Sequence, residues 1–433
     1  MSLVRSLYRA AAGAASACLG PVRLLRGEMG ASWDAEYAER LGDAGGEGPV
    51  DLWMQASSVG EVRGSLPVLD AVRSRRPGAA LLLTATTRTG REQARQAAGR
   101  IGAASGYFPF DFPGAVRRRL DRTRPAMIAL FETEIWPELI ATAAERGIRV
   151  AIVNGRISDE SLPRYRLVRP LIRETLARLD LVAARTPLDA ERFAGLGARA
   201  DRITVTGDVK FDLPPPPDAG DVARFRDGFG LENGAPLLVA GSTADGEDPL
   251  VLEAFRATLR TAPSARLLLA PRHPERFDSA AESARSAAFT VRRRSAGETM
   301  PVPPGGVIVL DTIGELRLAY GAARAAFVGG SLVSSGGQNL LEPASAGLAP
   351  ITGPDNSNFR EAAARLEAAD ALIRVRNAVE LGSAWAHALS DPQAAHARGE
   401  RARGVVALGA GAGARSADLL LRLLDAPRGA VRS

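Results

Sequence analysis

The chain has 433 residues, of which 46% are hydrophobic and 24% are charged, as in a soluble globular protein with two or three domains. Basic residues exceed acidic ones by six, but the two signs are interspersed and aromatic residues make up only 5%, which does not indicate a nucleic-acid-binding groove. The motif G-x-x-x-x-G-K-[ST] does not occur, which excludes a P-loop nucleotidase.

Residues 1–30 predict a helix that anchors the chain at a membrane interface. The stretch without charge, Ala10–Val22, is 13 residues long and is too short to span a bilayer. On a helical wheel Arg5 and Arg9 share one broad face and Tyr8 lies on another face that is mainly apolar, so we expect the basic residues to meet anionic headgroups. A cleaved signal peptide and a plain solvent-facing helix are the alternatives.

Two series of apolar, β-branched runs, with helical stretches between the runs, predict two doubly wound α/β domains. Each run is continuous rather than alternating, as in parallel strands buried on both faces. The runs occupy residues 50–56, 79–86, 106–110, 126–132, 148–154, 180–185 and 202–207 in the first series, and 236–242, 265–272, 289–295, 306–312, 325–331, 348–353 and 371–377 in the second.

Four consecutive prolines in residues 212–221 predict the linker between these domains, because proline cannot continue a helix or a central strand. We therefore place an N-terminal domain at 31–211 and a C-terminal domain at 222–433. Open α/β sheets bind ligands at the carboxyl ends of their strands, so we expect the two domains to face each other across a ligand-binding cleft.

The first polar cluster follows the first strand. Ser57, Ser58 and Gly60 predict a tight turn, with Glu61 at the start of the next helix. Glu61 either compensates the helix dipole or acts as a general base, because a carboxylate in a partly dry cleft can have its pKa raised toward neutrality.

The second cluster, Glu132-Thr133-Glu134, follows the fourth strand. Two acids so close together repel each other unless one of them binds a cation or a hydroxyl group, which favours a functional role. A metal site is the competing interpretation, but further oxygen ligands are not evident nearby. Lys210 is the only lysine, and a compact ammonium there suits a specific charge contact.

The C-terminal half predicts an anion-binding pocket. Glycines 329, 330, 336 and 337 allow backbone N–H groups to approach a phosphate, and a helix starting near Asn339 offers its positive end. Glu342 is placed to accept hydrogen bonds from ribose hydroxyls. The complete set of expected donor contacts is Ser242, Arg272, Gly314, Glu315, Leu316, Gly337, Asn339 and Glu342.

Other cofactor chemistry has little support. The single cysteine, Cys18, cannot form an internal disulfide, and His273, His387 and His396 lack the spacing of a helical zinc site, so we expect no metal and no other cofactor. G-x-G-x-x-G does not follow any predicted strand, which disfavours a dinucleotide-dependent dehydrogenase.

As an ordered set, the motifs resemble those of the Kdo transferases, which move 3-deoxy-D-manno-octulosonic acid (Kdo) from CMP-Kdo to a lipid A precursor. The resemblance spans nearly the whole chain. It rests on "RGEMGASWDAEYAERLG", "SSVGEV", "TATTRTG", "YFPFDFP", "ETEIWP", "VNGRIS", "GDVKFD", "APRHPERF", "IGEL", "GGSLVSSGGQNLLEPA" and "GPDNSNF".

The resemblance implies a GT-B fold, an acceptor site in the N-terminal half, CMP-Kdo in the C-terminal half and inverting, metal-independent transfer at the cytoplasmic face of the inner membrane. Glu61 is similar to the family's catalytic base. We expect the acceptor or the transition state to be supported by Ser58, Gly60, Glu132, Glu134 and Lys210.

The chain departs from the family pattern at several positions. Gln55 and Gln338 stand where histidine is common, and Asp208, Asp355 and Gly155 also differ. Glutamine still donates a hydrogen bond but does not titrate. Two alternatives remain: another GT-B enzyme that uses a UDP-sugar and a lipid-linked acceptor, and a non-catalytic membrane-peripheral binding protein.

Overall fold

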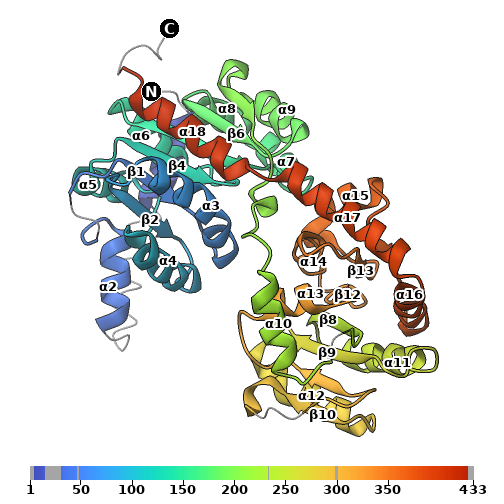
Figure 1. The fold of residues 1–433 in the computed structure, drawn as a ribbon. Helices are drawn as coiled ribbons and strands as arrows, with labels where there is room; N and C mark the ends of the chain where they lie inside the picture. The colour runs from blue at the N-terminus through green and yellow to red at the C-terminus, as the bar shows by residue number, and fades with distance from the viewer. Residues whose placement is uncertain (1–3, 15–30, 46–47, 233, 298–300, 428–433) are drawn as a thin grey trace. The chain divides into compact units, whose positions relative to one another are not determined.

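The computed structural model describes residues 4–14, 31–45, 48–232, 234–297 and 301–427. The chain forms two compact α/β units. Unit 1 comprises Met1–Asp212 and Ala410–Ser433, and unit 2 comprises Leu213–Gly409. Each unit contains one sheet whose strands are all parallel, with helices on both faces (Figure 1), which confirms the predicted α/β class.

Unit 1 is built on a seven-stranded sheet of order β3-β2-β1-β4-β5-β6-β7. Its strands are β1 (Leu52–Gln55), β2 (Leu81–Ala85), β3 (Ala104–Tyr107), β4 (Met127–Phe131), β5 (Arg149–Gly155), β6 (Leu181–Ala184) and β7 (Ile203–Val205). Its helices are α2 (Ala31–Arg40), α3 (Val59–Arg75), α4 (Arg88–Ile101), α5 (Pro113–Thr123), α6 (Pro137–Glu145), α7 (Ser161–Leu167), α8 (Arg169–Leu176), α9 (Pro187–Leu196) and α18 (Ala412–Asp425), with 3-10 turns η1 (Ala200–Arg202) and η2 (Val209–Phe211). Helices α3, α4 and α18 cover one face of the sheet, and α5, α6, α8 and α9 cover the other.

Unit 2 repeats this plan with the order β10-β11-β9-β8-β12-β13-β14. Its strands are β8 (Leu237–Thr243), β9 (Arg266–Pro271), β10 (Val291–Arg293), β11 (Val307–Val309), β12 (Ala325–Val328), β13 (Pro350–Thr352) and β14 (Ile373–Arg374). Its helices are α10 (Ala219–Asp227), α11 (Asp248–Thr258), α12 (Phe277–Ser286), α13 (Leu316–Ala322), α14 (Leu341–Ser345), α15 (Arg360–Ala368), α16 (Ala378–Ser390) and α17 (Pro392–Gly409), with 3-10 turns η3 (Pro274–Arg276), η4 (Arg294–Ala296) and η5 (Ser357–Phe359).

Strand order creates one crevice in each unit. In unit 1 the chain runs outward from β1 through β2 to β3 and then returns to place β4 on the other side of β1. In unit 2 the chain reverses in the same way between β8 and β12. Loops diverge where the order reverses, so the carboxyl ends of β1 and β4, and of β8 and β12, are the places where such sheets bind ligands.

The end of the chain differs from the domain boundaries expected from sequence. The sequence predicts that residues 410–433 belong to the C-terminal domain, but in the structure they belong to unit 1. The reason is that α18 is amphipathic and buries Ala417 and Leu420 against the face of the sheet that α3 covers. The carboxylate of Asp212 accepts hydrogen bonds from backbone N–H groups at the start of α18.

Among the described residues, one helical stretch, Pro392–Asp425, is long and apolar enough to cross a membrane by length and composition. This stretch comprises α17 and α18, and 44% of its apolar 18-residue window is buried within the protein. Helix α18 packs on the sheet of unit 1, and α17 packs against α14, α15 and α16, so the stretch is weak support for a membrane span.

The N-terminal helix contacts unit 1 through its polar face. Residues 4–14 are helical, whereas the rest of the predicted anchor, 15–30, lies outside the described residues. Arg9 donates to both carboxylate oxygens of Glu138, at 2.8 and 2.6 Å, and the Tyr8 hydroxyl donates to Asp111 at 2.7 Å. Arg5 is buried against Glu145. The expectation that Arg5 and Arg9 face lipid headgroups is therefore wrong, because carboxylates of the protein, the buried Glu138 and the partly exposed Glu145, bind them.

Candidate functional site

Glu61 lies in the first turn of α3, beside the carboxyl end of β1. Its carboxylate accepts hydrogen bonds from the Ser57 N–H at 2.9 Å and the Ser58 hydroxyl at 3.1 Å, while its own N–H donates to the Ser58 oxygen at 3.3 Å. The hydrogen bond from the Glu61 N–H to Ser58 is that of a capping box, whereas the Glu61 carboxylate reaches back to the N–H of Ser57, one residue before the N-cap. Ser58 is thus the helix N-cap, and Gly60 lies inside the first turn of α3 rather than in the tight turn expected from sequence.

The environment of Glu61 favours its protonated form. Burial raises the pKa of its carboxyl from 4.5 to about 7, with further raising by the negative charges of Glu134 and Glu132. The hydrogen bonds from Ser57 and Ser58 lower this pKa and only partly offset the burial. A carboxyl group that titrates near neutral pH is suited to exchange a proton with a hydroxyl group.

A chain of hydrogen bonds holds Glu134 in the same crevice. The Gln55 amide donates to Glu134 at 3.2 Å and to the Thr86 hydroxyl at 3.0 Å, and the Trp136 indole donates to Glu134 at 2.7 Å. The Gln55 oxygen accepts from Thr84 at 2.7 Å, so both ends of this buried amide are used. Sequence reasoning treated Gln55 only as a departure from a family pattern and missed its role in holding Glu134.

Glu132 and Lys210 form part of a second charged group at the carboxyl ends of β4 and β5. Glu132 has a φ of 60°, a conformation that side chains other than glycine rarely adopt, and such strain is found at functional sites. Burial raises the pKa of its carboxyl, and the positive charges of Lys210 and Arg185 counter that effect. Arg185 also pairs with Asp208 at 3.3 Å.

The predicted site residues of unit 2 lie after the carboxyl ends of four strands, β8, β9, β11 and β12. Ser242 adopts a φ of 56° at the end of β8. The Asn339 side chain donates to Glu342 at 3.2 Å and accepts from the Leu341 N–H at 3.0 Å. Burial raises the pKa of Glu342, while the Asn339 hydrogen bond and the positive charges of Arg317 and Arg272 lower it.

The turn at residues 314–316 is fixed by a contact that sequence analysis missed. Gly314 has a φ of 96°, and Leu316 begins α13. Glu315 is the N-cap residue of that helix, but its carboxylate pairs with Arg294 at 2.8 Å and also accepts from the Thr312 hydroxyl. Glu315 is thus held by the protein itself, which leaves it less suited to contact a donor.

The glycine loop after β12 differs from the phosphate cradle expected from sequence. The N–H groups of Gly330, Ser331 and Leu332 all donate to the fully buried carboxylate of Glu247, at 2.6 to 2.9 Å. A fourth N–H, that of Ala244, donates to Glu247 at 2.8 Å. Of the four glycine amides expected to approach a phosphate, that of Gly330 is therefore bound to a protein carboxylate, and that of Gly329 donates to the Gly241 oxygen at 2.9 Å.

The remaining glycines of this loop are required by close packing. The N–H of Gly336 donates to Asp355 at 2.7 Å, and that of Gly337 donates to the Gly330 oxygen at 2.8 Å. A Cβ atom at Gly336 would lie 2.3 Å from the Asn358 side chain. The loop is thus a packed scaffold that presents Asn339 and Glu342.

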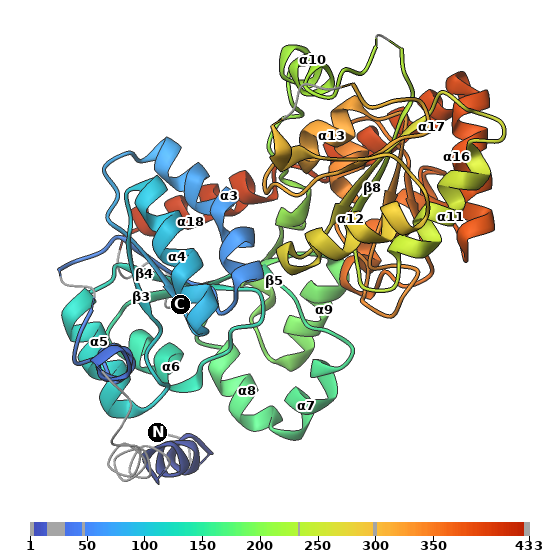
Figure 2. The ribbon, with the colours of Figure 1, turned by 90° about the horizontal axis from the view of Figure 1, so that it is seen from below.

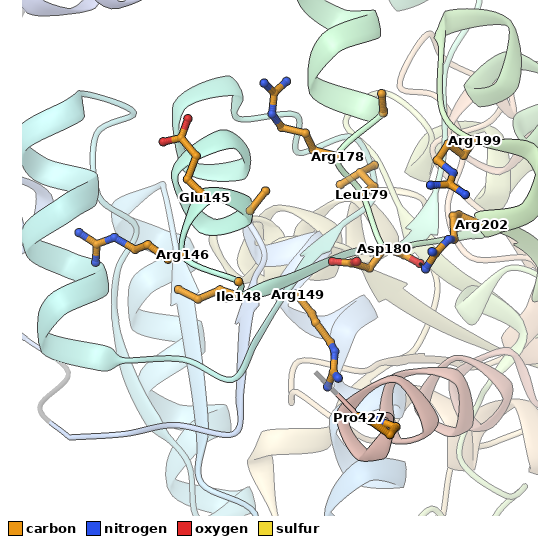
Figure 3. A pocket seen from close by; sticks show the side chains of 13 residues that line it. Glu145, Arg146, Ile148, Arg149, Arg178, Leu179, Asp180, Arg199, Arg202 and Pro427 are labelled. Atoms are coloured by element: carbon orange, nitrogen blue, oxygen red, sulfur yellow. Dashed lines mark hydrogen bonds between the residues drawn. The ribbon is translucent and has the colours of Figure 1, made fainter. Parts of the chain in front are cut away.

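A cavity of about 820 Å³ lies elsewhere in unit 1, at the amino ends of β5 and β6 (Figure 3). Arginines dominate its wall, but Arg146, Arg178 and Arg199 pair with the nearby acids Asp121, Glu174 and Asp201. The cavity contains none of the predicted site residues. Over the described part of the chain, no group of three or more His, Cys, Asp or Glu residues is arranged as metal ligands.

The raised pKa of Glu61 has a consequence for stability. Between pH 4.5 and about 7 the folded chain keeps a proton on Glu61 that the unfolded chain loses. Stability from this group is therefore present at low pH and falls as the pH rises through that window. We expect Glu61→Gln to gain stability relative to the unmodified chain between pH 5 and pH 8, as measured by urea unfolding. If the difference in unfolding free energy between Glu61→Gln and the unmodified chain does not change with pH, the raised pKa is contradicted.

Comparisons with known proteins agree with this geometry. The family model described as 3-deoxy-D-manno-octulosonic-acid transferase (kdotransferase) matches residues 35–213. The 3-deoxy-D-manno-octulosonic acid transferase of Bordetella pertussis is 39% identical over 405 residues, covering 90% of this chain and 92% of that protein. The enzyme of the same name from Haemophilus influenzae is 35% identical, covering 75% and 76% of the two chains.

Solved structures match the fold at low sequence identity. UDP-GlcNAc 2-epimerase from Neisseria meningitidis gives a TM-score of 0.59 at 12% identity, covering 87% of this chain and all of that one. A glycosyltransferase from Rickettsia africae gives a TM-score of 0.56 at 12% identity, covering 87% and 98%. These similarities confirm the expected GT-B architecture of two doubly wound sheets.

Proposed function

The chain belongs to the 3-deoxy-D-manno-octulosonic acid transferase family, a family of glycosyltransferases, and on that basis we propose its substrates and mechanism. We propose that it transfers Kdo from CMP-Kdo to a lipid A precursor of the lipid IVA type, with inversion and without a metal, at the cytoplasmic face of the inner membrane. The observation that carries the proposal is Glu61, whose pKa of about 7 makes it a general base at the working pH.

Unit 1 receives the acceptor in this mechanism. Glu61 takes the proton from an acceptor hydroxyl as that oxygen attacks the anomeric carbon of Kdo, and the bond from that carbon to the CMP phosphate oxygen breaks in the same displacement. One displacement inverts the anomeric centre. Glu134, which Gln55 and Trp136 hold in place, orients the acceptor by accepting hydrogen bonds from the hydroxyl groups of the acceptor.

Unit 2 receives the donor. The glycine-loop amides are bound to Glu247, so the charge that grows on the departing CMP phosphate requires other partners. We assign this charge to Arg272 and Arg317, whose positive charges both act on Glu342. Asn339 and Glu342 bind the ribose hydroxyls, and Lys210 of unit 1 suits the Kdo carboxylate.

A donor competition assay tests the nucleotide preference. Transfer from CMP-Kdo is followed by mass spectrometry of the lipid product in the presence of CMP or UDP. CMP should inhibit and UDP should not, and added EDTA should leave the rate unchanged. The rival enzyme that uses a UDP-sugar predicts no transfer from CMP-Kdo in this assay.

The non-catalytic alternative is motivated by Gln55 and Gln338, which replace histidines common in the family. It predicts that CMP-Kdo binds but that the lipid gains no mass. The retention of Glu61 with a raised pKa argues for an active enzyme. A mass increase of the lipid by Kdo would reject the binding-protein alternative.

A further inference from the structure

Helices α7 and α8 meet in an exposed corner that is rich in arginine. The segment 161–173 contains four arginines and no aspartate or glutamate. Arg164, Arg166 and Arg169 are exposed. At the tip of the corner, Leu167 is 85% exposed and Val168 is 48% exposed. Figure 2 shows α7 and α8 at the periphery of unit 1, with the corner turned outward.

The corner is held rigidly from beneath. Ile172 and Leu176 of α8 are buried in the core on that face of the sheet, and Leu162 and Tyr165 of α7 pack against the same core. The Ser158 hydroxyl accepts from the Ser161 N–H at 3.1 Å at the start of α7. The exposure of Leu167 is therefore a property of packed helices and does not arise from an unpacked loop.

The arginines of the corner differ from several exposed arginines on other helices. Elsewhere, Arg95, Arg224 and Arg376 each pair with an acid three or four residues away on the same helix. Residues 161–173 contain no acid, and Glu174, the acid on α8, pairs with Arg178 at 2.8 Å. Positive charge therefore accumulates around the two exposed aliphatic side chains. Aliphatic side chains surrounded by arginines are typical of a surface that lies in the headgroup region of an anionic bilayer.

We propose that the α7–α8 corner is a membrane-docking surface, in which Leu167 and Val168 insert between anionic phospholipid headgroups and Arg164, Arg166 and Arg169 bind their phosphates. This assignment moves the membrane contact away from Arg5 and Arg9, which bind carboxylates of the protein. Helix α7 follows the carboxyl end of β5, and Glu61 and Glu132 follow the carboxyl ends of β1 and β4. Docking through α7 therefore brings the carboxyl ends of these strands toward the lipid surface. The significance of Glu61 and Glu132 at the lipid surface rests on the proposed function, whereas the docking of the corner does not.

A fluorescent label at position 167 reports insertion directly. Cys18 is the only cysteine, so Leu167→Cys in a Cys18→Ser background takes one environment-sensitive dye. We expect a blue shift with vesicles of phosphatidylcholine and phosphatidylglycerol, and a smaller shift with phosphatidylcholine alone. The matched control is Leu408→Cys, which places the dye at a 90% exposed leucine of unit 2, and its spectrum should not change. An unchanged spectrum at position 167 would overturn the proposal, and so would a shift caused by an acidic polymer but not by vesicles.

Charge removal provides the second readout. Replacing Arg164, Arg166 and Arg169 with serine should weaken binding to anionic vesicles by about fivefold for each arginine, with little effect on neutral vesicles. The charge-matched control replaces Arg95, Arg224 and Arg376 with serine, and equal loss in both triple variants would contradict a specific surface. Both triple variants should transfer Kdo normally to an acceptor without acyl chains. If the unmodified chain transfers nothing to that acceptor while the dye still shifts, the proposed function fails and the docking surface stands.

Discussion

Glu61→Gln should lower kcat for Kdo transfer by about 10²–10⁴-fold, because glutamine cannot accept the proton of the attacking hydroxyl. The amide oxygen can still accept a hydrogen bond from Ser57 or Ser58, so α3 should keep its N-terminal cap. Affinity for CMP-Kdo should be nearly unchanged, since Glu61 belongs to unit 1 and the donor is assigned to unit 2. Single-turnover kinetics measure the chemical step, and calorimetry with CMP-Kdo measures the binding.

The control is Glu191→Gln, which removes an exposed carboxylate of the same unit. This variant should retain full activity. Unchanged turnover in Glu61→Gln would reject the general-base role. Loss of CMP-Kdo binding in that variant would instead show that Glu61 contacts the donor.

The second large effect is expected at Glu247. Its buried carboxylate accepts four backbone N–H groups, three of them from the glycine loop. In Glu247→Gln the amide NH₂ group would face N–H donors that then lack an acceptor. Such a loss should cost about 3–5 kcal/mol of stability. The displaced loop should also weaken CMP binding by about 100-fold, because it carries Asn339 and Glu342.

Thermal unfolding and CMP titration separate these two consequences. Glu253→Gln is the matched control. Glu247 is the N-cap residue of α11, and Glu253 lies within that helix with its side chain exposed. It should leave both quantities unchanged. If Glu247→Gln lowers stability but CMP still binds normally, the glycine loop does not form the donor site.

Local patterns were sufficient to predict the strands of each sheet and the polar residues at their carboxyl ends. All fourteen strands overlap the apolar runs, although β3 starts two residues before the predicted run. Continuous apolar runs identify buried parallel strands because both faces are covered, and chemistry at their carboxyl ends then follows from topology. Glu61, Glu132 and Glu134 were placed correctly at such ends for this reason.

Features that depend on distant partners were beyond the sequence. The positive face of the N-terminal helix is consistent with lipid headgroups or with protein carboxylates, and only the fold shows that Glu138 and Asp111 lie beneath it. Glycines in a loop indicate close backbone approach, but they do not say whether a phosphate or a carboxylate fills the space. In this chain Glu247, 82 residues before Gly329, fills it.

Glu247 carried one signal that could have been used. It follows the carboxyl end of β8, which lies next to β12 in the sheet of unit 2. An acid at such a position has backbone N–H groups of the neighbouring loop within reach. The return of α18 to unit 1 had a similar signal in its amphipathic pattern, but that pattern does not state which sheet it covers.

The pH dependence of single-turnover Kdo transfer in the preformed complex tests the central claim most directly. If Glu61 is the base, the rate should rise with pH around a midpoint near 7 and then level off, following the pKa of its carboxyl. His273→Gln, which removes the histidine next to Arg272, should leave that midpoint in place. A rate that is independent of pH from 5 to 9, or a midpoint that disappears in His273→Gln, would contradict the account.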